Sequence, residues 1–254
     1  MSQPLKNFYL ARRNPALSAD AFARRWRRHG ELAMSLPLWR YANGYQHCDV
    51  LAAPPADAAA QIAPAWNADY DGVGIVYFDS PADMEQLGVH PEFPTLLADE
   101  SGAFSEAVAN TAVMTTEQEL RRRSGVAAKL IAFLRARDGV DAATFRRRWD
   151  RHVGLVLGAE ETERLVLRYS HNHPIEQDAV DDGNLDVRTR ISIGLTDIAG
   201  VAEIGFASVA DLAAYLALPS RRTIGEDLET FVDLARSEFV ATNEVVMAPR
   251  RVAP

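Results

Sequence analysis

The chain has 254 residues, of which 48% are hydrophobic and 24% are charged, as in globular proteins with a packed core. Its net charge of −8 disfavours nucleic acid as a partner, because binding a phosphate backbone requires a basic surface. No apolar run approaches the ~20 residues of a membrane span, the N-terminus lacks a signal-peptide pattern, and the lone Cys48 cannot form an intramolecular disulfide. We therefore expect a cytoplasmic protein that binds neither nucleic acid nor membranes.

The most legible feature of the sequence is an internal repeat. Segment 6–12 (KNFYLAR) resembles segment 129–135 (KLIAFLR). Further matched pairs follow in the same order along both halves: Ser18 and Asp141, Phe22 and Phe145, Trp26 and Trp149, His29 and His152, Tyr45 and Tyr169, His47 and His171, Asp83 and Asp211. The gaps between matched pairs fall only where loops are expected, so the second half is a diverged copy of the first.

The first copy opens with alternating apolar residues at 5–12, a pattern typical of a strand. Ser18 stands where a helix N-cap belongs, and the helix after it carries Phe22, Trp26 and His29 on one face. Strands at about 41–48 and 72–78, a helical region at 81–97 and a strand at about 107–114 complete this copy. The second copy repeats the order, with Asp141 as N-cap, a helical region at 209–231, and strands at 127–136, 165–172, 201–207 and 239–247.

The order β-α-β-β-α-β in each copy indicates an α+β, ferredoxin-like fold. We predict a first repeat over residues 1–116, a linker over 117–125, which is charged and without apolar periodicity, and a second repeat over 126–254. A sheet with helices on one face leaves its other face uncovered, and a second copy in the same chain can cover it. Two such sheets packed face to face give an intramolecular, pseudo-dimeric α/β barrel.

Histidines and tyrosines recur in both copies. His29 and His152 occupy equivalent places on an apolar helix face, where a histidine is more often a core residue than a catalyst. On the second strand of each copy, alternation puts tyrosine and histidine on one face, and such a face under a histidine-bearing helix predicts a small pocket with polar tips. The candidate catalytic residues are His29, His47, His152 and His171, and the candidate substrate-binding residues on these strands are Tyr45, Tyr169 and His173.

Other chemistry is less well supported. His171 and His173 are spaced so as to allow two metal ligands, but no Cys or carboxylate cluster accompanies them, so we predict no metal site. Glu203 stands in a strand where the first copy has Ile75. It is either a substrate-binding carboxylate with a pKa raised by burial or a structural partner of an arginine or a backbone group. The sequence has no glycine-rich phosphate loop, GxSxG or CxxC motif, so we expect no cofactor.

Several segments of the first half resemble motifs of the EthD family, within the dimeric α/β-barrel superfamily. They are 17–22 (LSADAF), 26–30 (WRRHG), 40–41 (RY), 45–47 (YQH), 70–73 (YDGV), 78–80 (FDS) and Asp99-Glu100 ahead of Phe104. The second half fits more loosely, because Ala199 replaces Asp71, although Glu203 suits the family pattern better than Ile75. The resemblance implies a small cofactor-independent protein acting on hydrophobic or aromatic metabolites, and two pockets that are not equivalent.

Two classes of function follow. The first is a lyase-type enzyme (dehydratase, decarboxylase or cyclase) that transfers protons on a small aromatic or polyketide-like substrate. In it, His47 or His171 acts as base or acid, and Tyr45 or Tyr169 polarises a carbonyl or phenol, as these side chains do in acid–base catalysis. A cofactor-free oxygenase of phenols is a variant of this class. The second is a non-catalytic binding or accessory protein. Both classes of function are compatible with a pseudo-dimeric monomer and with a homodimer. The sequence does not indicate which half holds the working pocket.

Overall fold

The strands that open each half, β1 (Leu5–Ala11) and β5 (Ala128–Leu134), are buried along their whole length in the computed structural model, which describes residues 5–52, 69–175 and 194–251. Each lies at the centre of a four-stranded antiparallel sheet made by its own half. The other strands are β2 (Gly44–Val50), β3 (Gly72–Phe78), β4 (Ala112–Arg122), β6 (Val166–Pro174), β7 (Gly200–Phe206) and β8 (Glu238–Ala248). Their order around one closed barrel is β1-β3-β2-β8-β5-β7-β6-β4, which confirms the predicted fold.

Two long strands of 11 residues each, β4 and β8, close the barrel. β4 pairs with β1 of its own half and then with β6 of the other half, and β8 pairs with β5 and then with β2. The predicted linker of 117–125 is therefore corrected, because residues 117–122 are strand that pairs with β6. Their charged side chains concealed the alternation, since Glu117 is buried and pairs with Lys6 inside the barrel.

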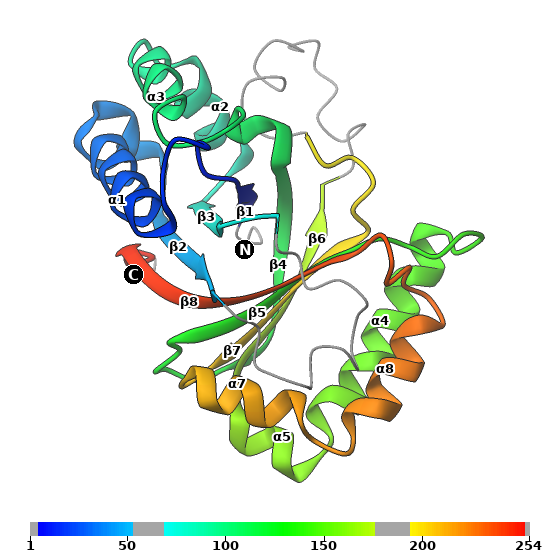
Figure 1. Cartoon of the computed structure of the whole chain (residues 1–254). Coiled ribbons are helices and arrows are strands. Elements are labelled where there is room, and N and C mark those ends of the chain that lie inside the picture. The colour runs from blue at the N-terminus through cyan, green and yellow to red at the C-terminus, as the bar shows by residue number, and fades with distance from the viewer. Residues whose placement is uncertain (1–4, 53–68, 176–193, 252–254) are drawn as a thin grey trace.

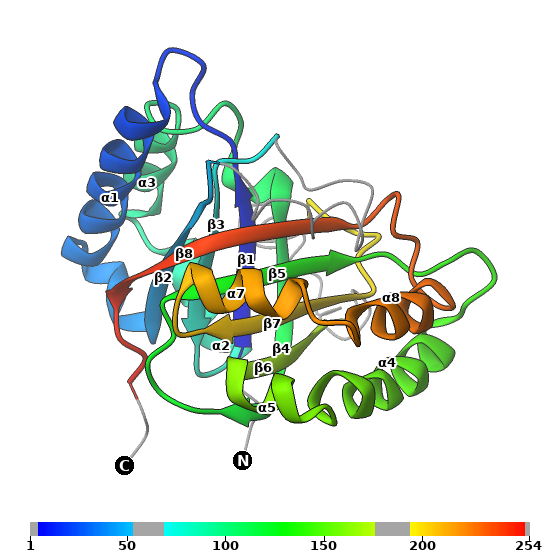
Figure 2. The same cartoon turned by 60° about the horizontal axis from the view of Figure 1, so that its bottom comes forward.

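The helices lie outside the barrel, in one group for each half (Figure 1). The first group comprises α1 (Ala19–Ser35), α2 (Pro81–Val89) and α3 (Phe93–Glu100), and the second comprises α4 (Ala142–Leu157), α5 (Glu160–Leu165), α7 (Val209–Leu216) and α8 (Arg221–Glu229). Figure 2 shows α7 across the strands of the second half, on the side of the barrel away from α3. The strand expected from residue 41 starts at Gly44 instead, because Pro37 begins a short 3-10 helix, Pro37–Tyr41.

The predicted helix starts and buried faces are confirmed. The Ser18 side chain accepts a hydrogen bond from the backbone N–H of Ala21, and that of Asp141 accepts one from Thr144. Such bonds satisfy backbone donors that the first helical turn leaves free. The residues buried on the faces of α1 and α4 are Phe22, Trp26, His29, Gly30 and Ala33, and Phe145, Trp149, His152 and Val156.

The barrel interior contains a buried ion network that joins the two halves. The Nζ atoms of Lys6 and Lys129, which are equivalent in the repeat, lie 2.6 and 2.7 Å from the two carboxylate oxygens of Glu203. All three side chains are 0% exposed. Glu117 adds a second partner for Lys6 at 2.7 Å, and Glu244 adds one for Lys129. Glu203 thus links the first strand of one copy to the first strand of the other.

This network corrects the expected pKa of Glu203. Burial alone would raise that pKa, but Lys129 and Lys6 outweigh burial and hold it well below its ordinary range. Of the two interpretations left open by the sequence, the raised pKa is therefore wrong, and Glu203 pairs with lysines rather than with an arginine or a backbone group. The cause is that the lysines come from other strands, and only barrel closure brings them to the carboxylate.

Gly200 and Gly72 begin equivalent strands beneath the indole rings of Trp149 and Trp26, where an added Cβ would overlap the ring. We expect Gly200→Ala to destabilise the protein by about 1–3 kcal/mol through overpacking. Gly154→Ala is the matched control, because its Cβ would meet nothing within 4 Å on the exposed face of α4, and alanine is the better helix former. Urea unfolding checks both, and equal stability of the two variants would contradict the expected overlap.

Candidate functional site

The structure separates the eight predicted site residues into three places. His29, Tyr45 and His47 lie between the sheet of the first half and its helices, packed around Trp26 and Phe104. His152, Tyr169, His171 and His173 lie in the equivalent place of the second half, around Trp149 and Phe231. Glu203 lies apart from both groups, because it points into the barrel.

In the first half, the basic nitrogen of His47 is occupied. The imidazole stacks on Trp26 with ring centroids 4.0 Å apart, and its Nδ1 contacts the Arg27 guanidinium, which in turn pairs with Asp49. A guanidinium only donates hydrogen bonds, so Nδ1 of His47 must accept. Burial, and then the charge of Arg27, hold the pKa of His47 well below its ordinary value. A neutral His47 whose lone pair is already used is poorly placed to remove a proton from a substrate.

His29, also in the first half, shares its carboxylate partner. Its Nδ1 lies 2.8 Å from Oδ2 of Asp99, and the same carboxylate receives two hydrogen bonds from the guanidinium of Arg25, at 2.6 and 2.9 Å. Burial lowers the pKa of His29, and Asp99 opposes that shift. Because Asp99 also neutralises Arg25, less of its charge is available to stabilise a protonated His29.

In the second half, His152 has a carboxylate of its own. Its Nδ1 lies 2.8 Å from Oδ2 of Asp227, whereas Arg148, the counterpart of Arg25, donates to the backbone carbonyl of Thr230. Burial is the largest effect on the pKa of His152 and lowers it, and Asp227 opposes the shift. A neutral imidazole donates its Nδ1–H to the carboxylate and keeps the lone pair of Nε2 for a substrate. This is the arrangement of an oriented general base.

His152 and Tyr169 line a small cavity of about 40 Å³ between β5, β7 and helices α4, α7 and α8. Its walls are mainly aliphatic, and Trp149, Tyr215, Arg221 and Phe239 also line it. His171 does not line the cavity, but its Nε2 lies 3.3 Å from the Tyr169 hydroxyl while its ring stacks on Trp149 at 3.7 Å. Burial, helped by the neighbouring His173 and His152, lowers the pKa of His171 to about 2, so this ring stays neutral.

Sequence reasoning missed Arg221 and Tyr215. In the aligned copies they replace Phe93 and Leu87, two buried apolar residues of the first half. Polar side chains at positions where the other copy is apolar were a usable signal, similar to the one that singled out Glu203. The two halves thus differ most where helices α7 and α8 meet the cavity.

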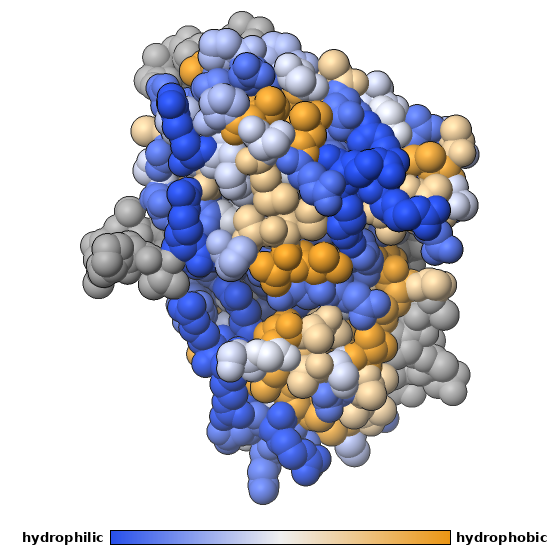
Figure 3. Space-filling model, turned by 90° about the vertical axis from the view of Figure 1, so that its left-hand side faces the viewer, coloured by the Kyte–Doolittle hydropathy of each residue, from blue (hydrophilic) through white to orange (hydrophobic). Residues whose placement is uncertain are grey.

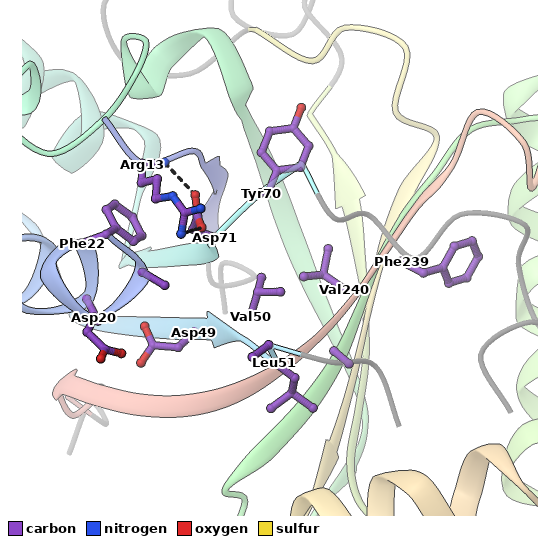
Figure 4. A pocket seen from close by; sticks show the side chains of 14 residues that line it. Arg13, Asp20, Phe22, Asp49, Val50, Leu51, Tyr70, Asp71, Phe239 and Val240 are labelled. Atoms are coloured by element: carbon purple, nitrogen blue, oxygen red, sulfur yellow. Dashed lines mark hydrogen bonds and ion pairs between the residues drawn. The ribbon is translucent and has the colours of Figure 1, made fainter. Parts of the chain in front are cut away.

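A larger pocket of about 520 Å³ lies at the rim of the first half, between the start of α1 and the ends of β2 and β3 (Figure 4). Phe22, Val50 and Leu51 form apolar walls, and Asp71 is already paired with Arg13. On the side of the molecule that carries α1, hydrophobic residues gather between longer stretches of hydrophilic ones (Figure 3). None of the eight predicted site residues lines this pocket, whereas His152 and Tyr169 line the smaller cavity. We therefore regard the cavity beside His152 as the candidate site for chemistry.

The described residues hold no group of three or more His, Cys, Asp or Glu side chains arranged to bind a metal ion. The same residues form no helix with the length and apolar character needed to cross a membrane.

The closed barrel of two repeated halves defines the class, a tandem dimeric α/β-barrel protein. The chain belongs to the EthD family, because the EthD domain matches it twice, over residues 14–107 and 137–235. A solved anthrone oxidase-like protein superposes with a TM-score of 0.57 at 8% identity, covering 99% of this chain and 95% of its own. Chlorite dismutase from Candidatus Nitrospira defluvii gives a TM-score of 0.55 at 9% identity, covering 97% and 93%. These likenesses show the fold alone. A search of curated proteins gave no match.

Proposed function

We propose that this protein is a cofactor-independent, lyase-type enzyme that transfers protons on a small hydrophobic, aromatic or polyketide-like metabolite in the cytoplasm. The working half is the second, and His152 is its general base. The observation that carries the proposal is the pairing of His152 with Asp227 at a cavity that also receives the hydroxyl-bearing Tyr169.

Each residue has a chemical part in the proposed reaction. Nε2 of His152 takes a proton from a carbon next to a substrate carbonyl, and Asp227 stabilises the imidazolium that forms. The electron pair moves onto the carbonyl oxygen, to which Tyr169 donates a hydrogen bond. The electron pair then returns from the oxygen to form a carbon–carbon double bond as the bond to a hydroxyl on the next carbon breaks. The imidazolium gives its proton to this hydroxyl, which leaves as water. His171 acts as a positioning residue, because its Nε2 lies 3.3 Å from the Tyr169 hydroxyl while the ring itself does not line the cavity.

Exchange of substrate hydrogen in D2O tests this proposal without knowledge of the natural reaction. Small aromatic ketones and β-diketones are incubated with the protein, and loss of the α C–H signal is followed by NMR. We expect exchange above the buffer rate for at least one compound. In the His152→Ala variant this exchange should fall towards the buffer rate. Saturable binding with no exchange in any compound would instead identify a binding or accessory protein.

Tyr169→Phe tests the role of the hydroxyl. We expect a loss of at least about tenfold in the exchange rate, because a hydrogen bond to a developing oxyanion is removed. Tyr45→Phe is the matched control from the first half, where the hydroxyl bonds that of Tyr9 at 2.7 Å. It should leave the rate unchanged. Equal rates for the Tyr169 variant and the wild type would remove Tyr169 from the mechanism.

A cofactor-free oxygenase of phenols is the second candidate, and the likeness to an anthrone oxidase-like protein favours it. The same base would remove a phenolic or benzylic proton to give an electron-rich anion, which reduces dioxygen and is itself oxidised. An oxygen electrode separates the two candidates, since only the oxygenase consumes dioxygen when phenolic compounds are added.

A further inference from the structure

The cavity beside His152 contains a buried cation that has no anionic partner among the residues that the structure describes. Arg221 is 6% exposed and lines this cavity. One guanidinium nitrogen donates to the hydroxyl of Tyr215 at 2.8 Å, and the guanidinium carbon lies 4.7 Å from the centroid of the same ring. Nε is buried and has no hydrogen-bond partner within residues 5–52, 69–175 and 194–251. Across the described parts of the chain, no carboxylate forms an ion pair with Arg221.

An arginine in this setting is costly for the fold, because burying a charge without a counter-ion sacrifices its hydration. The fold does not require a cation at this place, since Phe93 fills the equivalent position of the first half with an apolar ring. Arginine also presents its donors in a flat fork that matches the two oxygens of a carboxylate. Arg221 therefore points to a ligand rather than to packing.

The other groups around the cavity agree with an anionic ligand. Tyr169 and Tyr215 bring hydroxyl groups that can donate, and the described residues of the lining include no carboxylate. A cavity of about 40 Å³ exceeds the ~10–15 Å³ that one water molecule needs, and it suits a group of a few non-hydrogen atoms.

We propose that this cavity binds a carboxylate of the substrate, with Arg221 as the residue that selects it. The inference rests on the proposed function in one respect, namely that the cavity is where the substrate binds. It narrows the substrate class to small aromatic or polyketide-like acids. Arg221 and His152 line the same cavity, so a carboxylate held by Arg221 would bring the rest of the substrate to the base.

Acetate and acetamide are matched probes for this site, because they share one shape and differ in charge. We expect titration with acetate at constant ionic strength to shift the NMR signal of the Trp149 indole N–H saturably. Acetate should bind at least about tenfold more tightly than acetamide, as expected for charged hydrogen bonds. In Arg221→Met this preference should vanish, whereas Arg222→Met, which removes an exposed arginine next in the chain, should keep it.

Equal binding of acetate and acetamide by the wild type would overturn the inference, even if Arg221→Met failed to fold. So would a folded Arg221→Met variant that still prefers acetate. The proposed function fails separately. His152→Ala should keep the preference for acetate while losing hydrogen exchange. If the wild-type protein prefers acetate but catalyses no hydrogen exchange in any compound, the anion site stands and the proposed enzymatic function fails.

Discussion

Glu203→Gln is expected to lower the free energy of unfolding by about 3–5 kcal/mol, because it leaves two buried lysines short of charge compensation. The substitution keeps the shape of the side chain, so the loss reports on charge rather than on a cavity. Urea unfolding measures it. Glu226→Gln is the matched control, since Glu226 forms an exposed i,i+4 pair with Arg222 and should change stability by less than about 0.5 kcal/mol.

The pH dependence of stability provides a second reading of the same network. The pKa of Glu203 is depressed in the folded state, so its contribution is complete above the unfolded value of ~4.3 and declines as the pH falls below it. Wild-type protein should therefore lose more stability than Glu203→Gln when the pH is lowered from about 5 to about 3. Parallel stability curves for the two proteins would show that the pKa of Glu203 is not depressed in the native state.

The repeat allowed most of the fold to be predicted. Matched pairs such as Trp26 and Trp149 fixed the element order twice, and the need to cover a second sheet face led to the barrel. The grouping of tyrosine and histidine beneath a helix followed from alternation along β2 and β6. The order of elements and this grouping follow from residues close together in the chain, and the repeat then supplied the second sheet of the barrel.

What escaped prediction depends on residues far apart in the chain. Lys6 and Glu203 become neighbours only when β1 and β7 enter one barrel, so the sequence could not decide between a raised pKa and a structural role for Glu203. Charged residues also made the end of β4 look like a linker, although Glu117 points inward. The domain boundaries at 116 and 126 remain predictions.

Comparison of the two halves suggests why only one would work. The first half retains the histidine and tyrosine but surrounds them with partners that use up their hydrogen-bonding groups, as Arg27 does for His47. The second half places Arg221 and Tyr215 where the first has Phe93 and Leu87. After duplication, one copy is free to become a structural support while the other keeps polar groups at its cavity.

His152→Ala is expected to lower the rate of hydrogen exchange or turnover by at least about 10²-fold, the usual contribution of a positioned general base. Because burial lowers the pKa of His152 below its ordinary value, the wild-type rate should rise with pH through an inflection below about 6.5 and then level off. The variant should lose this inflection along with the rate.

His29→Ala is the matched control for His152→Ala, because it removes the equivalent side chain from α1, also beside a carboxylate. If the second half alone is active, this change should leave both the rate and its pH profile intact while costing a similar amount of stability. A rate loss in His29→Ala and none in His152→Ala would move the active site to the first half. Losses in both would mean that each half has a working base. The difference between Arg221 in the second half and Phe93 in the first would then concern the choice of substrate rather than activity.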